Sequence, residues 1–287
     1  MKLKIRTQTG QSKKEQELPK QFNEPVNPDL IKRAVSVIQS NKRQKYGASP
    51  KAGKRASAYL SKRRNSYRST YGIGQSRTPR KVMSRRGQRL NYVGAFAPQT
   101  VGGRRAHPPK SEKNLIKKIN KKEKRKAIRS AMSANIILSY LEEKNYDVPK
   151  DYPFILDNSF ESLSKTSEVK KAMEKLGFEL ETKRKIRAGK GKLRGRKYTR
   201  KKGPLFVVSK DCRLLLASKN INIESVKVES LNAELLAPGG DPGRTTLFTQ
   251  AAIERLKREN LFFDNVKIEK KVIEEKKEVK KIKSKKI

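Results

Sequence analysis

The chain has 287 residues, of which 72 are lysine or arginine and 28 are aspartate or glutamate, so its formal net charge is +44. The apolar fraction of 34% is low for one core spread over the whole chain, and no apolar run approaches the roughly 18 residues of a membrane span. Because Cys212 is the single cysteine, the chain can form neither an intrachain disulfide framework nor a cysteine-rich zinc site. Because so much positive charge repels itself unless a polyanion neutralises it, these features predict a protein of a reducing compartment with a nucleic-acid partner.

The first predicted elements are a short strand and a helix. Residues 1–6 alternate charged and apolar side chains, which predicts a strand, and residues 17–20 are expected to return from it. Asn27 is a predicted N-cap with Pro28 in the first helical turn, and apolar residues then recur at helical spacing to about residue 40. Residues 1–45 are therefore expected to begin a folded core.

Residues 46–110 are predicted to form a long basic loop that binds RNA. Between Asp29 and Glu112, 82 residues contain no carboxylate, whereas a solvated surface usually mixes charges of both signs. Cations in such a loop can neutralise phosphates, and its aromatic residues, among them Tyr46, can stack on unpaired bases. A disordered basic linker is the alternative. The expected phosphate-binding residues are Lys54, Arg55, Lys62, Arg63, Arg64, Arg68, Arg77, Arg80, Lys81, Arg85, Arg86, Arg89, Arg104 and Arg105, with His107 as a hydrogen-bonding residue. The candidates for base stacking are Tyr59, Tyr67, Tyr71, Tyr92 and Phe96.

Regular structure is expected to resume at Ser111, a predicted N-cap, with a helix that continues to about residue 141. The strands predicted beyond it are 153–157, 205–208, 214–217, 225–228 and 246–249. The helices predicted beyond it are 168–176, 231–236 and 250–259. This alternation predicts an α/β core of residues 1–45 and 111–265, with a mostly parallel sheet covered by helices. The Lys/Glu-rich tail, residues 266–287, is expected to be an exposed helix or, by a small preference, disordered.

A second basic segment, residues 183–202, holds 12 cations in 20 positions and is expected to be an internal basic loop that contacts RNA. Its spacing is not that of a Walker phosphate loop, and no fingerprint of a nucleotide cofactor or set of metal ligands occurs elsewhere, so neither cofactor nor metal is expected. Cys212 is predicted to be a small core residue. The expected RNA-binding residues of this loop are Arg187, Lys190, Lys192, Arg194, Arg196, Lys197 and Arg200.

Three blocks of residues recur together in one known family. One block is 187–197 with 202–204, the second is 236–251 with its Gly243-Arg244 pair, and the third is 94–109 with 126–131. In this order and spacing, from about residue 22 to 260, the chain resembles the universal large-subunit ribosomal protein L-four family in its archaeal and eukaryotic form.

This resemblance implies a structural protein of the cytoplasmic ribosome that performs no chemistry. It implies an α/β core on the outside of the large subunit, contacts with ribosomal RNA and neighbouring ribosomal proteins, and a role in assembly. The long loop would line part of the polypeptide exit tunnel, with the nascent peptide near its tip, and no membrane would be involved. A free nucleic-acid chaperone or a chromatin-type packing protein is the main alternative. An RNA-processing enzyme is disfavoured, because the sequence shows no carboxylate cluster, metal-ligand set or phosphate loop to support one.

Overall fold

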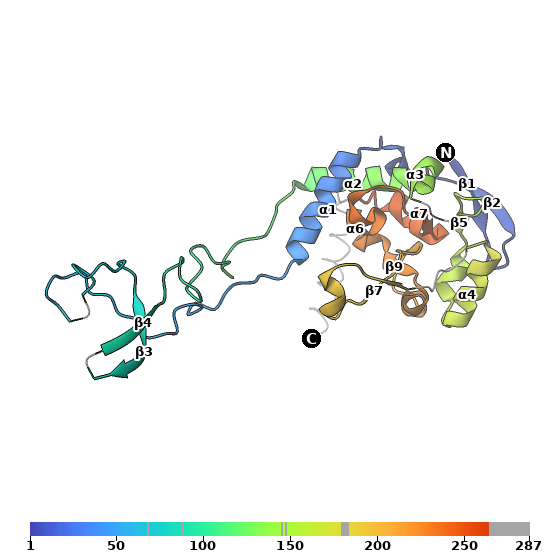
Figure 1. Ribbon diagram of the computed structural model, residues 1–287. Helices are drawn as coiled ribbons and strands as arrows, with labels where there is room; N and C mark the ends of the chain where they lie inside the picture. The colour runs from blue at the N-terminus through green and yellow to red at the C-terminus, as the bar shows by residue number, and fades with distance from the viewer. Residues whose placement is uncertain (68, 88, 145, 147, 179–183, 264–287) are drawn as a thin grey trace, which may run out of the picture. The chain divides into compact units, whose positions relative to one another are not determined.

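The computed structural model describes residues 1–67, 69–87, 89–144, 146, 148–178 and 184–263 (Figure 1). They form two compact units, namely a core unit made of the described residues of Met1–Asn41 and Lys117–Ile287, and a loop unit, Lys42–Ile116. Arg68 and the predicted tail of residues 266–287 lie outside the described residues. None of the helices that the structure describes is long and apolar enough to cross a bilayer.

The regular elements are short. The strands are β1 (Lys2–Arg6), β2 (Ser12–Glu17), β3 (Arg80–Arg86), β4 (Arg89–Gly94), β5 (Ile155–Leu156), β6 (Lys185–Ile186), β7 (Tyr198–Thr199), β8 (Leu205–Val208), β9 (Glu224–Lys227) and β10 (Thr246–Phe248). The α-helices are α1 (Pro28–Lys42), α2 (Lys121–Ala134), α3 (Leu138–Glu143), α4 (Thr166–Lys175), α5 (Leu214–Ala217), α6 (Ala233–Leu236) and α7 (Gln250–Arg258). Short 3-10 turns at Lys20–Asn23, Asn158–Ser162, Lys190–Leu193, Lys219–Ile221, Val228–Ser230 and Pro238–Gly240 connect several of them.

The core unit is a mixed α/β fold built on two small sheets, with strand orders β2-β1-β5 and β10-β8-β9. Strand β8 pairs in parallel with both of its neighbours, and β1 pairs in parallel with β5 but antiparallel with β2. An isolated parallel bridge between Leu156 and Thr249 links the two sheets. The predicted α/β class is thus confirmed, while two three-stranded sheets stand where one larger sheet was expected.

Strand β8 is buried on both faces and separates two hydrophobic clusters. Because successive side chains of a strand point to opposite faces, Leu205 and Val207 enter one cluster, whereas Phe206 and Val208 enter the other. The first cluster also receives side chains from α1, α2, α6 and α7, and the second from α4 and α5. Burying each large apolar side chain of β8 contributes roughly 1.5–3 kcal/mol, so this strand is a main source of core stability.

Three predicted elements of the core unit were wrong in type or extent. Residues 214–217 form helix α5 and not a strand, since a short leucine run fits either structure and Leu216 is 69% exposed, unlike a buried strand residue. The helix expected from Ser111 begins only at Lys121, where the Glu123 carboxylate accepts a hydrogen bond from the backbone N–H of Asn120 at 3.4 Å in a capping box. The partner of β1 is residues 12–17, earlier than expected.

The loop unit contains one element that the sequence did not predict, the antiparallel hairpin β3–β4 (Figure 1). A bulge between Val82 and Ser84 shifts its register, and Tyr59 forms an isolated bridge with Arg80 at its base. The sequence shows no sign of these strands, because apolar and polar residues do not alternate along them and neither face of the hairpin is apolar. Met83 and Val93 are exposed among the cations.

Candidate nucleic-acid interface

The predicted phosphate-binding cations are mostly exposed, and none of those that the structure describes forms an ion pair with a carboxylate. Their charge is therefore left uncompensated by the protein. The predicted cations of the loop unit that are exposed are Lys54, Arg55, Lys62, Arg63, Arg64, Arg77, Arg85, Arg86, Arg89 and Arg105. Arg80, Lys81 and Arg104 are half-buried. Since most of these groups already lie in water, a phosphate could reach them without any unfolding.

The guanidinium of Arg80 makes three hydrogen bonds within the loop unit. It donates to the carbonyl oxygen of Ser76 at 2.7 Å and that of Thr78 at 3.3 Å, and to the hydroxyl of Ser76 at 2.9 Å. These bonds fix the turn that leads into β3. Arg85 makes one such contact, from Nε to the carbonyl oxygen of Gly87 at 3.0 Å.

The hairpin places two arginines directly opposite each other. Arg86 of β3 pairs with Arg89 of β4, and the structure gives neither side chain a carboxylate partner. Like charges that face each other across two strands are destabilising in the absence of a counterion. A phosphate between the two guanidinium groups would remove that repulsion, so this end of the hairpin is suited to an anion.

The aromatic candidates fall into two groups. Tyr59 and Tyr67 are 54% and 68% exposed, and Tyr92 is also exposed, so much of each side chain is accessible to solvent. Tyr71 is half-buried, with the Arg77 guanidinium 4.5 Å from its ring centroid, and this pair forms a flat cationic surface. Phe96 is half-buried at a positive φ of 65°, and its carbonyl accepts from the backbone N–H of Arg104 at 3.2 Å.

The described part of the internal basic loop, residues 184–202, is closed by a two-residue ladder between β6 and β7. Within it the backbone N–H groups of Arg194 and Arg196 both donate to the carbonyl of Gly191, at 3.1 Å each. This tight turn leaves the charged groups outside, although Arg187 also donates from Nε to the carbonyl of Arg196 at 3.1 Å. The exposed predicted residues are Arg187, Lys190, Lys192, Arg194, Arg196, Lys197 and Arg200.

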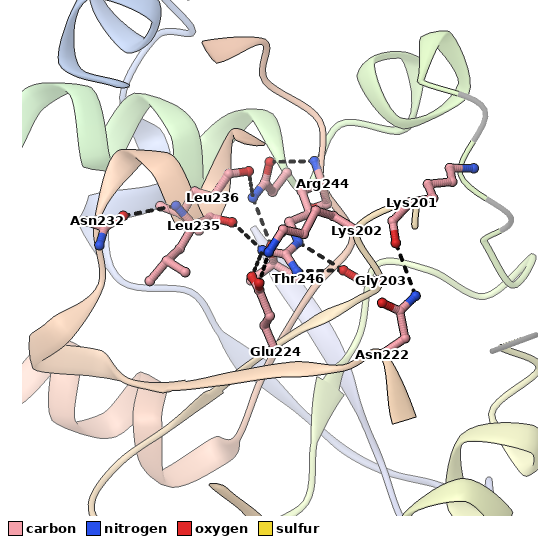
Figure 2. A network of polar contacts seen from close by, with 11 residues as sticks. Lys201, Lys202, Gly203, Asn222, Glu224, Asn232, Leu235, Leu236, Arg244 and Thr246 are labelled. Carbon is pink, nitrogen blue, oxygen red and sulfur yellow. Dashed lines mark hydrogen bonds and ion pairs between the residues drawn. The ribbon is translucent and has the colours of Figure 1, made fainter. Parts of the chain in front are cut away.

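A buried polar network anchors the end of the internal basic loop to the core unit (Figure 2). The guanidinium of Arg244 is fully buried and donates two hydrogen bonds to the carbonyl of Gly203, at 3.0 and 2.7 Å. It also donates to the carbonyl of Leu235 at 2.8 Å and to the carboxylate of Glu224 at 2.7 Å. Asn222 donates to the carbonyl of Lys201 at 3.1 Å. Two backbone carbonyls at the end of the loop are thereby fixed in place.

Glu224 balances the charge in this network. Its carboxylate contacts both the Lys202 amine and the Arg244 guanidinium. Burial opposes ionisation, but the hydrogen bond from Lys202 and the charge of Arg244 together hold the pKa of Glu224 below its usual range. The carboxylate is therefore ionised at neutral pH, and Arg244 is not left as an unpaired buried cation.

Sequence reasoning missed this anchor, although it noted Arg244 as part of a recurring block. The sequence does show a single arginine among small and apolar residues, which suggests burial. A buried guanidinium needs several hydrogen-bond acceptors. Gly203 carried a further signal, because its α-carbon lies so close to the carbonyl oxygen of Asn222 that no Cβ would fit. Neither signal identifies its partners without the structure.

The remaining candidates for chemistry show no assembled site. His107 is exposed, and Cys212 is half-buried beside the second hydrophobic cluster, where burial raises the pKa of its thiol. No group of three or more His, Cys, Asp or Glu side chains suited to a metal ion occurs within the part of the chain that the structure describes.

Comparison with known proteins gives one consistent match. The profile of the ribosomal protein L4/L1 family matches residues 16–259. The "Large ribosomal subunit protein uL4" of Nanoarchaeum equitans is 47% identical over 253 residues, covering 86% of this chain and 94% of that protein. The proteins of the same name from Methanoculleus marisnigri and Archaeoglobus fulgidus are 42% and 39% identical over 262 residues, each covering 89% of this chain and 98% of the relative.

Proposed function

Since this chain belongs to the ribosomal protein L4/L1 family, we propose that it is a structural constituent of the large ribosomal subunit and acts by binding ribosomal RNA. Such a protein contributes affinity and position and catalyses no reaction. Its place is the ribosome of the cytoplasm, and its partners are large-subunit ribosomal RNA and the ribosomal proteins beside it.

The observation that supports this proposal best is the uncompensated charge of the two basic segments. Residues 30–111 hold 21 cations and no acid, and residues 183–202 hold 12 cations and no acid. The described cations among the predicted sites have no carboxylate partner. Phosphates supply the missing negative charge, and the counterions released on binding add to affinity. Exposed tyrosines such as Tyr59 and Tyr67 add stacking on unpaired bases, which is how proteins recognise irregular RNA.

The two units then have different tasks. The core unit, with its two hydrophobic clusters, folds at the outer surface of the subunit and presents the internal basic loop to RNA. The long basic loop, residues 46–110, penetrates ribosomal RNA and lines part of the exit tunnel, where its tip lies near the nascent peptide. Both RNA contacts form early, so the protein also contributes to assembly of the subunit.

Sedimentation of ribosomal particles tests this function. We expect the full-length protein to remain with large subunits after a high-salt wash, because a loop enclosed by folded RNA is held by more than screened surface charge. A free nucleic-acid chaperone or a chromatin-type packing protein would bind mainly through phosphates and would be released by salt. Complete release as free protein would contradict the ribosomal function.

A further inference from the structure

Two glycines bring the outgoing and returning segments of the loop unit together. A Cβ on Gly47 would lie 2.5 Å from the backbone nitrogen of Ser111, and one on Gly53 would lie 2.5 Å from the α-carbon of Arg104. Between these points the backbone N–H of Ala48 donates to the carbonyl of Pro109 at 2.9 Å. At both glycines the two segments approach each other too closely for a side chain to fit between them.

A hollow of about 750 Å³ opens beside the contact at Gly47. That size lies within the roughly 300–1,000 Å³ of typical small-ligand pockets. Its walls combine an aromatic ring, cations and one carboxylate, contributed by Arg43, Tyr46, Arg105, His107, Lys110 and Glu112. Lys113 adds a further cation, and Pro108, Pro109 and Leu115 contribute apolar surface. It lies entirely within the loop unit.

The polar groups of the hollow have few partners in the protein. The Arg43 guanidinium lies 5.7 Å from the centroid of Tyr46, which is 59% exposed, and this pair offers a flat surface for stacking. Among the described residues, the side chains of Arg105, Lys110 and Glu112 make no hydrogen bond or ion pair with the protein. Their hydrogen-bonding capacity is available to a ligand.

Glu112 gives the hollow its specificity. It is the first carboxylate after 82 residues without one, and it stands among cations that attract phosphates. A carboxylate at such a place would repel RNA unless it accepted hydrogen bonds from a base. Guanine presents two adjacent donors on its pairing edge, N1–H and the N2 amino group, which match the two oxygens of a carboxylate, whereas the other bases present at most one amino donor group or one imino donor there.

We infer that this hollow binds the base of one unpaired guanine of the RNA, stacked on Tyr46 and read by Glu112, with Arg105 and Lys110 at its flanking phosphates. The inference rests on the proposed function, since it names the nucleotide that one part of the long loop would recognise. A neighbouring hollow of about 560 Å³ shares Arg105, Lys110 and Glu112 with the first and adds Lys54 and Arg104, so nucleotides beside the guanine would meet further cations.

The isosteric variant Glu112→Gln separates base recognition from simple charge. If only electrostatics mattered, removing a negative charge would tighten RNA binding. Under this inference, an amide nitrogen faces guanine donors and the affinity for large-subunit ribosomal RNA falls by about tenfold, the typical effect of losing one specific base contact. Glu142→Gln, a change of a carboxylate on α3 that is also exposed, is the control and should leave the affinity unchanged or slightly raised.

Chemical probing with kethoxal, which modifies the N1 and N2 atoms of unpaired guanine, identifies the base. Full-length wild-type protein bound to the RNA should protect one guanine that becomes reactive with either Glu112→Gln or Tyr46→Ala. Leu216→Ala, which removes a 69% exposed apolar side chain on α5 outside both basic segments, should leave that guanine protected. Hydroxyl-radical footprints elsewhere on the RNA should be unchanged in all variants, which shows that the protein remains folded and bound.

The inference is overturned if Glu112→Gln binds as tightly as the wild type or more tightly, or if the two variants expose no common guanine. The proposed function fails in a different way, because then the wild-type protein itself shows no footprint on large-subunit ribosomal RNA.

Discussion

Arg244 is a fully buried cation in a protein whose other charges are mostly in water. A buried guanidinium is tolerated only when its donors are satisfied and its charge is balanced. Here the carbonyls of Gly203 and Leu235 accept from it, and the Glu224 carboxylate neutralises it. The residue therefore holds the end of the internal basic loop without touching RNA in the proposed arrangement.

Replacing Arg244 should cost far more stability than replacing its exposed neighbour. Arg244→Met removes the donors to two part-buried carbonyls and leaves a cavity in place of a fully buried guanidinium, so we expect the free energy of unfolding to fall by about 2–4 kcal/mol. Lys202→Met removes an exposed amine from Glu224 and should cost under about 1 kcal/mol. Urea unfolding of the RNA-free protein measures both, and equal losses would show that the network does not anchor the fold.

Glu224 should make part of the stability depend on acid. Its pKa is lowered in the folded protein, so the unfolded chain binds more protons near pH 4, and stability is lost as pH falls through the folded pKa. We expect the wild type to exceed Glu224→Gln in stability by about 1 kcal/mol at pH 7, with the difference shrinking below about pH 4. Urea midpoints at pH 7 and pH 3 provide the comparison. A difference that does not change with pH would contradict the role assigned to the carboxylate.

At the scale of elements, the hairpin β3–β4 is a regular structure whose cations have no carboxylate partners among the described residues. The pair Arg86–Arg89 is unfavourable in the free protein and becomes favourable when an anion lies between the side chains. Tyr92 and Val93 on β4 are exposed beside these cations, so the hairpin buries little apolar surface of its own. Its stability should therefore depend on its binding partner.

The variant Arg89→Ser tests that dependence. Removing one phosphate contact should weaken RNA binding and lower the slope of log affinity against log salt by about 0.7–0.9. The thermal midpoint of the core unit should stay the same, because no core side chain is changed. Binding titrations at several salt concentrations give the slope. An unchanged slope would show that Arg89 contacts no phosphate.

Removing about residues 55–100 should leave a folded core. The residues of both hydrophobic clusters lie outside this span, so the deletion takes away no member of either cluster. We expect a cooperative thermal transition by circular dichroism at nearly the wild-type midpoint, together with a large loss of RNA affinity. Loss of the cooperative transition would mean that the long loop is part of the fold.

Helices whose capping residue and apolar spacing are both visible in the sequence were predictable. Helix α1 has an Asn27 cap whose side chain accepts from the N–H of Leu30 at 3.1 Å, and α7 begins after the similar cap Thr249. The short run Leu214–Ala217 was not predictable, since its type is decided by tertiary packing around it. The start of α2 depends on a capping box at Asn120 that competes with an equally plausible cap at Ser111.

The candidate interface was likewise predictable only in part. Clusters of cations are visible in the sequence because the absence of acids is itself a pattern. The anchor at Arg244 and the hollow at Tyr46 are not visible in the sequence, since each brings together segments that lie far apart in the chain. Sequence thus indicates where RNA binds, and structure is needed to show which residues position the binding groups.

For the whole molecule, charge and folding are divided between segments. Residues 30–111 and 183–202 carry 33 cations and no acid, whereas the net charge of the entire chain is +44. The strands of the two core sheets lie outside both segments. In such a protein the core folds with little repulsion between like charges, and most of the positive charge lies in segments that can bind RNA.

The most direct test is residue-resolved crosslinking of the protein to RNA in intact large subunits. We expect the crosslinks to fall mainly within residues 47–110 and 187–200, with few in the buried core strands. Crosslinks concentrated on the core unit, or none within residues 47–110, would contradict the assignment of the long basic loop to ribosomal RNA.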